Sequence, residues 1–461
     1  MIKSARLDER GVSWKILLTV GPDGRICAIG LGEGELAGLA RSYGNVDTDP
    51  VDDLEYDAVI IGDKGGDTHD LNNLISRIKP AGIFVNAGRK CAAGQLKNTG
   101  LRYSRHYAAL PPEKPRLFIP LASRKLRSKG LAFHSPGSFK ARAGLAAAKG
   151  LNLLGIKGHL EKHVIRIHAK DEDVLTKQGL MEWLAKKLGY PIIDLVIYAG
   201  SESPRRKITA LAVAAESKED IVVKIADTEP GIQAIKQESE ALRAIEDSPL
   251  SSQGPRLICE GQWNSYYVQL QEKIIGVNNK QTASLTSAHL DFLSQLSAID
   301  RRVLPFKQTN AWHNIENWAG VTSSIALPKV VRSSIEKVLS GEFADKPIIC
   351  HRTHGDFAPW NIKINKGKLF VYDWEDSLSD GLVLTDIFHF LYRQASLVGP
   401  WPGAQKLLRD MSNVSKRFLD IAGHEAIEID AVLTIWLLSE YSIKPSDFLC
   451  DMLGVISECS Q

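Results

Sequence analysis

Several features that would restrict the function of a protein are scarce or missing in this 461-residue sequence. It contains six cysteines and no CxxC pair, so we expect reduced thiols rather than a disulfide framework. Its net charge is only +3, from 57 basic and 54 acidic residues. This balance argues against a nucleic-acid-binding protein, because such proteins are usually much more basic.

Long apolar segments are missing as well. No apolar run reaches the roughly 18 residues that a membrane span needs. The polar N-terminus, Met1 to Arg6, is not followed by the apolar core of a signal peptide. With 44% hydrophobic residues the chain can still bury a sizeable core, and its length allows about two to four domains. We therefore expect a soluble, cytoplasmic protein of several domains.

The first hundred residues alternate short apolar runs with turns and helical stretches. Strands are predicted at residues 25–29, 56–63 and 81–85, with helices at 36–41 and 70–78. A glycine-containing turn, residues 30–34, follows the first strand, and glycines there let the backbone approach a ligand closely. Strand, helix and strand at this spacing indicate a parallel α/β sheet, which we assign to a Rossmann-like domain over residues 1–100.

The order of these segments resembles the class I S-adenosylmethionine methyltransferases. The resemblance rests on the glycine turn and on RIKPAGIFV at residues 77–85. It implies a site for S-adenosylmethionine. The interval between Gly30 and Asp57, however, is too short for the two further strands and the helix that the family places there. The alternative is a degenerate Rossmann module that transfers no methyl group.

Residues 101–173 form a strongly basic segment. From Arg102 to Lys149 there are eleven Lys or Arg residues and one acid, Glu113. Residues 136–154 are a candidate amphipathic helix, and a basic amphipathic stretch can contact an anionic membrane surface. The alternative is a basic connector with one solvated face, whose apolar side packs on the preceding domain. We place a domain boundary at residues 173/174.

Residues 174–280 predict a helix at 175–188 and strands at 192–198, 207–214, 221–226 and 266–272. Gly200 and Ser201 lie in the turn between the first two strands, where backbone N–H groups can bind nucleotide phosphates. An ordinary hairpin turn is the alternative. The last strand carries Gln269 and Gln271 and leads into residues 275–276, where we expect a hinge that binds the adenine ring of ATP.

Two charged residues in this part fall on inward faces. Lys224 lies inside a β-branched strand, and Glu238 shares a helical stripe with Ile235 and Leu242. Because buried charges are costly unless they are paired, we predict that Lys224 and Glu238 form the ion pair that holds nucleotide phosphates in kinase-like enzymes. The alternative is two unrelated surface charges.

The most informative stretch is HGDFAPWN at residues 354–361, followed by Asp373. Asp356 can accept the proton of a hydroxyl group, which makes it the candidate catalytic residue. Asn361 lies five residues later, and a hairpin predicted over residues 362–372 returns Asp373 beside it. Amide and carboxylate oxygens at these two positions predict a Mg²⁺ site.

Other residues near this stretch have supporting roles. His354 is predicted to support the loop by hydrogen bonding. Asp386, at the start of a helix, either braces the loop or caps that helix. Trp360 and Glu375 are candidate substrate contacts, with core packing as the alternative for Trp360.

HGDFAPWN and the DWE at residues 373–375 resemble the catalytic and metal-binding motifs of the aminoglycoside phosphotransferase and choline kinase family. The resemblance covers about residues 180–461. It implies a two-lobed, protein-kinase-like domain, with one lobe over residues 174–280 and the other over 281–461. It also implies transfer of the ATP γ-phosphoryl group to a hydroxyl, with Mg²⁺ as the metal.

Residues 387–409 contain no Asp or Glu but hold several aromatic residues. A polycationic acceptor would need carboxylates near the catalytic loop, so we expect a sugar or glycan hydroxyl. The sequence thus predicts an α/β plus α+β protein, with a Rossmann-like sheet fused to a kinase-like domain. Two alternatives stay open: an S-adenosylmethionine-dependent methyltransferase fused to a kinase-like part, and a nucleotide-binding scaffold without transfer activity.

Overall fold

The computed structural model describes residues 10–64, 70–88, 96, 99–133, 139–176, 178–200, 202–215, 218–274, 284–322, 326–340, 343–365, 368–424 and 427–459. The chain divides into two compact units. The first is Met1–Ile235 with Leu257–Lys273, and the second is Lys236–Arg256 with Ile274–Gln461. The architecture is mixed α/β, as expected.

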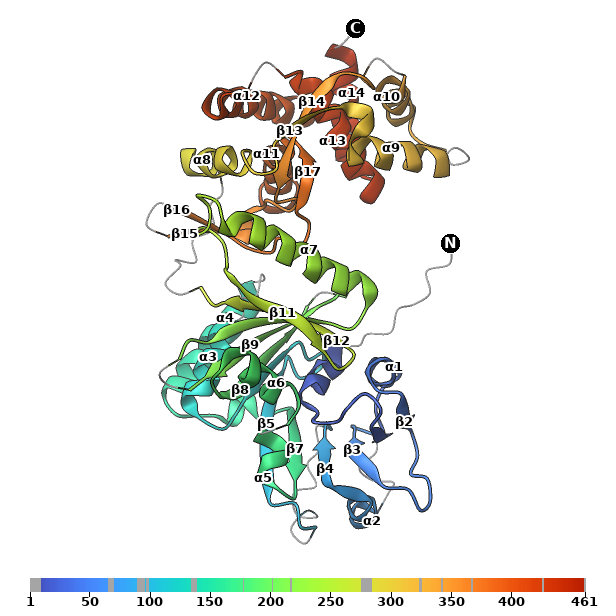
Figure 1. Ribbon diagram of the computed structural model, residues 1–461, viewed down its shortest axis with the longest axis vertical. Coiled ribbons are helices and arrows are strands. Elements are labelled where there is room, and N and C mark those ends of the chain that lie inside the picture. Colours follow the sequence, from blue (N-terminus) through green and yellow to red (C-terminus); the bar gives the residue numbers. More distant parts are fainter. Residues whose placement is uncertain are drawn as a thin grey trace. The chain divides into compact units, whose positions relative to one another are not determined.

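One large mixed sheet organises the first unit (Figure 1). Over the described residues it has twelve strands, and each neighbour in the following order is hydrogen-bonded to the next. In order across the sheet they are β11 (Leu257–Trp263), β12 (Tyr266–Glu272), β10 (Ile221–Ala226), β9 (Ile208–Ala214), β8 (Ile192–Ala199), β6 (Leu117–Pro120), β5 (Tyr103–Leu110), β7 (Val164–Ala169), β4 (Ile78–Asn86), β3 (Tyr56–Ile61), β1 (Arg25–Ile29) and β2 (Asn45–Asp47).

One end of this sheet is parallel. β1 pairs in parallel with β2 and with β3, and β3 pairs in parallel with β4. The predicted strands at 25–29, 56–63 and 81–85 are confirmed as β1, β3 and β4. β7 then runs antiparallel to both β4 and β5. β4 begins at Ile78, before the predicted start, and therefore includes Pro80.

The other end of the sheet is antiparallel and continuous with the first. β8, β9, β10 and β12 pair in turn, and β11 pairs with β12 at the edge. The connection is β6, in which Leu117 pairs with Tyr198 and Phe118 with Ile197 of β8. The segment expected as a connector, residues 101–173, thus supplies three strands from inside the sheet. Its apolar runs are buried as strands, and residues 173/174 do not separate the two units.

Helices cover both faces of this sheet (Figure 1). Trp14 and Ile16 of η1 and Leu180 and Leu184 of α6 pack on one face. The other face is covered by Leu74 of α2 and Leu126 of α3, among others. The helical segments of this unit are η1 (Arg10–Leu17), α1 (Glu33–Ser42), α2 (Leu71–Ser76), α3 (Arg124–Phe133), α4 (Phe139–Leu153), η2 (Gly158–Leu160), α5 (Glu172–Thr176) and α6 (Gly179–Leu188).

A buried lysine ties the start of the chain to the antiparallel end of the sheet. Lys15 of η1 is fully buried, and its Nζ lies 2.7 Å from Oδ2 of Asp227, just after β10. The same ammonium donates to Ser42 Oγ at 2.7 Å and to the Gly38 carbonyl at 2.6 Å. Burial acts to raise the pKa of Asp227, but the Lys15 ammonium lowers it below the ordinary 3.8. The pair is therefore ionised and fully hydrogen-bonded, which a buried charge requires.

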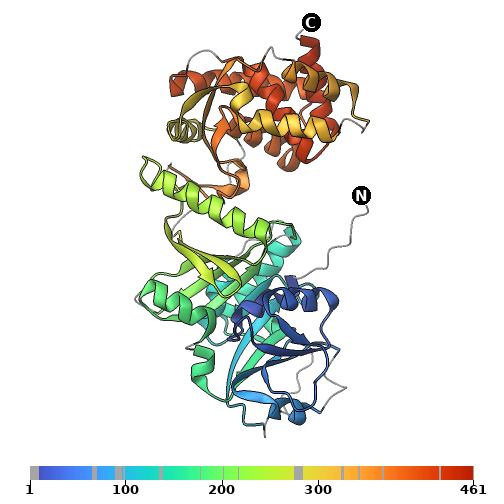
Figure 2. The same ribbon diagram turned by 45° about the vertical axis from the view of Figure 1, so that its right-hand side comes forward.

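The second unit has short strands surrounded by helices (Figure 2, yellow to red). β14 lies between β13 and β17 in a three-stranded sheet, and β15 and β16 form a separate hairpin. The strands are β13 (Arg302–Pro305), β14 (Pro347–Thr353), β15 (Ile362–Asn365), β16 (Lys368–Val371) and β17 (Leu378–Leu382). The helical segments are α8 (Ser287–Leu296), η3 (Phe306–Gln308), α9 (Asn310–Val321), α10 (Lys329–Leu339), η4 (Pro359–Asn361), α11 (Thr385–Arg393), the π-helical turn η5 (Gln394–Val398), α12 (Ala404–Ala422), α13 (Ile429–Ile443) and α14 (Asp447–Cys459). Helix α7 (Glu229–Glu246) contributes residues to both units.

Some element boundaries differ from the sequence-based expectation. The helix predicted over 175–188 is two helices, α5 and α6, because Gly179 has a left-handed φ of 74° and starts a new helix. Helix α10 begins at Lys329, directly after Pro328 at its N-cap. Strand β11 and helix α9 were not predicted.

Bilayer-spanning segments were not expected. Among the helices described, none combines the length and apolar character that crossing a bilayer requires. Of the six cysteines, Cys27, Cys259, Cys350 and Cys450 are described as free thiols.

Candidate functional site

The loop after β14 carries the HGD motif, and its backbone requires glycine at the centre. Gly355 has a φ of 83°, in the left-handed region that side chains disfavour. A Cβ atom at this position would lie 2.0 Å from the carbonyl oxygen of Asp376. The chain therefore turns here against the segment that follows Asp373.

Asp386 accepts two backbone hydrogen bonds from the same loop. Its Oδ2 accepts from the backbone N–H of His354 at 2.8 Å, and its Oδ1 accepts from the N–H of Gly355 at 3.0 Å. The residue lies inside the first turn of α11, whose N-cap is Leu384. Of the two roles considered for Asp386, the geometry is that of a brace for the loop rather than a cap of its own helix.

His354 is buried beneath the loop and bonded through both ring nitrogens. Its Nδ1 accepts from the backbone N–H of Asp356 at 3.3 Å, so Nε2 carries the proton and donates to the carbonyl of Tyr372 at 3.1 Å. The ring also packs on Trp374, with centroids 4.6 Å apart. These contacts connect the HGD loop to the DWE segment and suit the supporting role predicted for His354.

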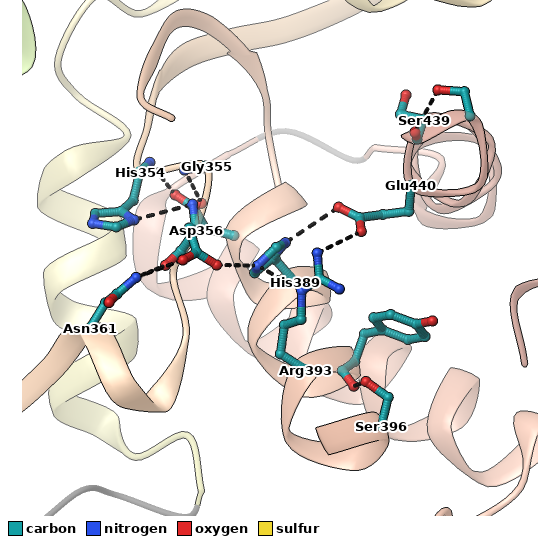
Figure 3. Close-up of polar contacts among 12 residues, drawn as sticks. His354, Gly355, Asp356, Asn361, His389, Arg393, Ser396, Ser439 and Glu440 are labelled. Atoms are coloured by element: carbon teal, nitrogen blue, oxygen red, sulfur yellow. Dashed lines mark hydrogen bonds and ion pairs between the residues drawn. The ribbon is translucent and has the colours of Figure 1, made fainter. Parts of the chain in front are cut away.

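The carboxylate of Asp356 is fixed from two sides (Figure 3). Asn361 Nδ2 donates to Oδ2 at 2.7 Å and to the Asp356 carbonyl at 3.0 Å. His389 Nε2 lies 2.8 Å from Oδ1. Because each carboxylate oxygen can accept more than one hydrogen bond, these partners leave Asp356 able to accept from a further donor. Its side chain remains 30% exposed, so such a donor can reach it.

Three residues of this arrangement were not predicted from the sequence. They are His389 and Arg393, both on α11, and Glu440 on α13 (Figure 3). His389 Nδ1 lies 3.4 Å from Glu440 Oε1, and Arg393 Nη2 donates to Glu440 Oε2 at 3.1 Å. His389 thus lies between two carboxylates, one at each ring nitrogen.

The charge states of this group follow from its contacts. Burial acts to lower the pKa of His389, but hydrogen bonds to Asp356 and Glu440 raise it from 6.5 to about 9. Burial acts to raise the pKa of Asp356, but the hydrogen bond and the charge of His389 bring it below the ordinary 3.8. At neutral pH the pair is therefore an imidazolium and a carboxylate.

Arg393 is a second cation beside His389. Its Nε lies 3.2 Å from His389 Nε2, and its charge acts to lower the pKa of His389. A protonated Nε2 cannot accept a hydrogen bond, so this contact is a close approach of two cations. The charge of His389 is balanced by Asp356 and that of Arg393 by Glu440. The four side chains Asp356, His389, Arg393 and Glu440 together carry no net charge.

The β15–β16 hairpin brings the two predicted metal-binding residues to its open end. Ile362 pairs with Val371, and the N–H of Tyr372 donates to the Asn361 carbonyl at 3.1 Å. Asp373 is the next residue. Its φ of 69° is left-handed, a conformation that costs a non-glycine residue about 1–3 kcal/mol and clusters at functional sites.

The donor set at this end of the hairpin fits Mg²⁺. Because Asn361 Nδ2 must face the Asp356 carboxylate, its amide oxygen is the atom left for a cation. Mg²⁺ is typically bound through one or two carboxylates together with substrate phosphates and water. Among the described residues no group of three or more His, Cys, Asp or Glu could hold a metal ion by itself.

Trp360 and Glu375 flank this region. Trp360, on η4, is 37% exposed, so it is not the core residue that the alternative reading required. Glu375 lies in the turn after Trp374 and is half-buried. Both remain candidate substrate contacts.

The residues predicted to bind ATP are distributed over both units. Lys224, on β10, belongs to the first unit, and Glu238, on α7, to the second. Both side chains are buried, with 7% and 0% exposure. Their pairing was predicted from their inward positions in the sequence, and it stays a prediction.

The remaining nucleotide-site residues lie in the first unit. The N–H of Gly200 donates to the Lys207 carbonyl at 3.3 Å, as in an ordinary hairpin turn, and Ser201 lies outside the described residues. Gln269 Nε2 donates to the Ile235 carbonyl at 3.3 Å, and Gln271 Nε2 donates to Gln269 Oε1 at 2.7 Å. The predicted hinge at residues 275–276 also lies outside the described residues.

No protein-family model matches the sequence, and no curated protein matches it. Solved structures of small-molecule phosphotransferases are nevertheless similar to it in structure. One is a protein from Haemophilus somnus 129PT, provisionally assigned as a fructosamine-3-kinase, with a TM-score of 0.40 and 16% identity over 61% of this chain and 97% of that chain. An amicoumacin kinase has a TM-score of 0.37 and 13% identity over 57% of this chain and 86% of its own.

A third similar structure is the spectinomycin phosphotransferase APH(9)-Ia in complex with ADP and spectinomycin. Its TM-score is 0.37 and its identity 11%, over 60% of this chain and 93% of that chain. Because all these TM-scores lie below 0.5, we base the function on the contacts around Asp356 alone.

Proposed function

We propose that this protein is a phosphotransferase that moves the γ-phosphoryl group of ATP to a hydroxyl group of a small molecule, with Mg²⁺ as the metal. The observation that supports the proposal is the Asp356 carboxylate, which is ionised, partly exposed and fixed by Asn361 and His389. An oriented carboxylate beside oxygen ligands for a divalent cation is the arrangement that transfer to an alcohol needs.

In this proposal Asp356 accepts a hydrogen bond from the acceptor hydroxyl and points its oxygen at the γ-phosphorus. A bond forms between that oxygen and phosphorus while the bond from phosphorus to the β–γ bridging oxygen breaks, and ADP leaves. The hydroxyl proton passes to Asp356 and then to solvent. Because a carboxylate with a lowered pKa is a weak base, orientation of the hydroxyl contributes more than early removal of its proton.

Asn361 and Asp373 would hold Mg²⁺, whose charge offsets the negative charge of the phosphate groups during transfer. The amide oxygen of Asn361 is oriented for this because its Nδ2 is held by Asp356. Lys224 with Glu238, Gly200 and Ser201 would bind the phosphates of ATP, and the strand of Gln269 and Gln271 would lead to the adenine ring.

The acceptor is proposed to be a neutral polyol such as a sugar. The absence of acids in residues 387–409 led to this expectation, but α13 brings Glu440 to the site from a distant part of the sequence. Glu440 is not available to an ammonium group, because Arg393 and His389 already neutralise it. We therefore keep the proposal of a neutral acceptor, now on the ground that Glu440 is already neutralised.

A transfer assay tests this function. The protein is incubated with labelled ATP and Mg²⁺ and with separate sets of neutral sugars, choline and aminoglycosides. We expect labelled product with neutral sugars, and a loss of turnover by about 100-fold or more in Asp356→Asn, because the carboxylate that orients the hydroxyl is lost. Binding of Mg·ATP, measured by calorimetry, should be largely kept.

Asp410→Asn is the matched control, since the Asp410 side chain is 41% exposed on α12 and forms a surface ion pair with Lys406, one turn away. It should transfer like the wild type. Turnover by Asp356→Asn near the wild-type rate would show that the base is misassigned. A response confined to aminoglycosides would overturn the proposal of a neutral acceptor. If the protein neither transfers phosphate to any acceptor nor hydrolyses ATP, the proposed phosphotransferase function is overturned.

The parallel strands β1, β3 and β4 favour a second proposal for the N-terminal residues, namely a Rossmann-like module that is degenerate. Gly30 at the end of β1 has a φ of 70°, as a close-approach turn would require. The backbone N–H groups of Gly62 and Lys64 donate to the Ile29 and Gly30 carbonyls, at 2.8 and 3.2 Å. These hydrogen bonds hold the turn at Gly30 against the segment after β3, which restricts the close approach of a cofactor to that turn.

We therefore expect calorimetry with S-adenosylmethionine to show no binding to the full chain. Mg·ATP is the positive control in the same cell. A dissociation constant in the micromolar range for S-adenosylmethionine would overturn the degenerate reading and revive methyl transfer as an activity of the N-terminal strands.

A further inference from the structure

The contacts of His389 go beyond what supporting a helix requires. It lies among apolar neighbours on α11, flanked by Phe388 and Phe390, and its side chain is 6% exposed. Burying an imidazole here would be easiest in the neutral form with one hydrogen bond. Instead both nitrogens face carboxylates, Asp356 at 2.8 Å and Glu440 at 3.4 Å. Neither carboxylate comes from α11 itself.

The two contacts fix different properties of the ring. The Asp356 contact places a donor on Oδ1 while Asn361 places one on Oδ2, so the plane of the carboxylate is set by two donors. The Glu440 contact sets the rotation of the imidazole, and Arg393 sets the position of Glu440 through a 3.1 Å hydrogen bond. The contacts therefore form a chain in which each side chain orients the next, from Arg393 to Glu440, then to His389 and finally to Asp356 (Figure 3).

We propose that His389 is the positioning residue of the transfer reaction: held by Glu440, it fixes the Asp356 carboxylate so that one of its oxygens faces the acceptor hydroxyl. This inference rests on the proposed phosphotransferase function and adds to it a residue pair on α11 and α13. A 1 Å displacement of a group that orients a substrate can lower a rate by about 100-fold. The effect therefore belongs to turnover rather than to ATP binding.

The ionisable groups in contact with His389 are few. In the described part of the chain they are Asp356 from the loop after β14, Glu440 from α13 and Arg393 from α11 itself. α12 also packs on α11, and no ion pair from it to His389 occurs among the residues described. Replacing His389 therefore changes one defined set of contacts.

Two amide variants distinguish a positioning role of His389 from a role in packing alone. His389→Gln can place an amide N–H near the position of Nε2 and keep the donor to Asp356. His389→Asn reaches only the position of Nδ1 and loses that donor. We expect kcat of His389→Asn to fall by about 30–100-fold and kcat of His389→Gln to fall by less than about 10-fold. In both variants KM for ATP should stay within about twofold of the wild-type value. Glu440→Gln should lower kcat as well, by an amount between the two.

His313→Asn is the matched control, because His313 is an exposed histidine on α9. It should leave kcat unchanged. A side-chain ¹⁵N NMR spectrum supplies a readout that does not depend on activity. At pH 7.5 one histidine signal should report protons on both ring nitrogens, and that signal should be missing in His389→Asn.

The outcomes test the positioning role of His389 separately from the proposed phosphotransferase function. If the wild type transfers phosphate and His389→Asn does so with the same kcat, the positioning role is overturned. The proposed phosphotransferase function is then unaffected. Equal loss of kcat in the Gln and Asn variants, with equally lowered melting temperatures, overturns it in favour of a structural role. A doubly protonated histidine in a wild-type protein that transfers nothing would overturn the phosphotransferase instead.

Discussion

At the scale of single residues, Asp356 and His389 depend on each other for their charge. The pKa of His389 is about 9 in the folded chain, above its ordinary 6.5. A group whose pKa is raised by folding stabilises the protein fully below its unfolded pKa, and that contribution is lost as pH rises through its folded pKa. The charged histidine should therefore add up to about 3 kcal/mol to the free energy of unfolding below pH 6.5, and this should disappear between about pH 6.5 and 9.

The test is the free energy of unfolding of wild type and of His389→Gln, measured by urea denaturation from pH 6 to pH 10. The difference between them should shrink as pH rises, because Gln carries no proton to lose. His313→Asn should show no such trend, since His313 is exposed. A difference between wild type and Gln that stays constant with pH would contradict the charge assigned to His389.

The sequence identified Asp356, Asn361 and Asp373 because they are close along the chain. It did not identify Glu440, which lies 51 positions after His389, since nothing in a single sequence places α13 beside α11. A signal for Glu440 did exist. It follows Trp436 by four residues and Leu437 by three, on a helix with buried apolar neighbours, so it is a carboxylate on an inward stripe. The same argument had been applied to Glu238.

At the scale of elements, the turn after β14 depends on one glycine. Gly355→Ala would combine a left-handed φ of 83° with a Cβ placed 2.0 Å from the Asp376 carbonyl oxygen. Because backbone cannot move aside as a side chain can, we expect a loss of at least about 3 kcal/mol in the free energy of unfolding and a loss of transfer activity. Urea denaturation and the transfer assay measure the two effects.

Gly189→Ala is the matched control for this substitution. Gly189, at the C-cap of α6, has a left-handed φ of 75°, but a Cβ atom there would meet nothing within 4 Å. It should cost only about 1 kcal/mol, which is the backbone strain alone. If both variants lost the same stability, the contact between Gly355 and Asp376 would not be as close as the structure has it.

Elements with a strong local pattern were predicted well, and those that depend on distant partners were not. Strand β10 has the predicted bounds, 221–226, because its β-branched run is unbroken. β11 was missed because it includes Glu260 and Gly261 and an irregular register near Cys259, which hide the alternation of an edge strand. The basic segment was interpreted as a connector because two of its strands pair with strands outside it, β7 with β4 and β6 with β8, and a single sequence does not show such pairings.

At the scale of the whole molecule, Lys15 and Asp227 join positions 212 residues apart. Lys15→Met would leave the Asp227 carboxylate buried without the ammonium group that is hydrogen-bonded to it. Removing one partner of a buried pair typically costs about 3–5 kcal/mol, because the remaining charge cannot be solvated. We expect a loss of that size in the free energy of unfolding of the full chain, measured by urea denaturation.

Lys186→Met is the matched control for Lys15→Met. Lys186 pairs with Glu182 on the surface of α6, with 73% of its side chain exposed, and such pairs contribute about 0–1 kcal/mol. Equal losses for the two variants would mean that Lys15 does not hold the two ends of the sheet together.

The pairing of β6 with β8 restricts how such a chain could exchange parts with other genes. A crossover at residue 173 would cut between strands of one sheet and leave the edges of β6 and β8 unpaired, which is a template for aggregation. A crossover at any single later point also fails, because β11 and β12 return to the first unit after residues 236–256 have joined the second. Because each unit is built from two separate stretches of the chain, no single crossover exchanges either unit whole, and the two ends of that sheet are inherited together.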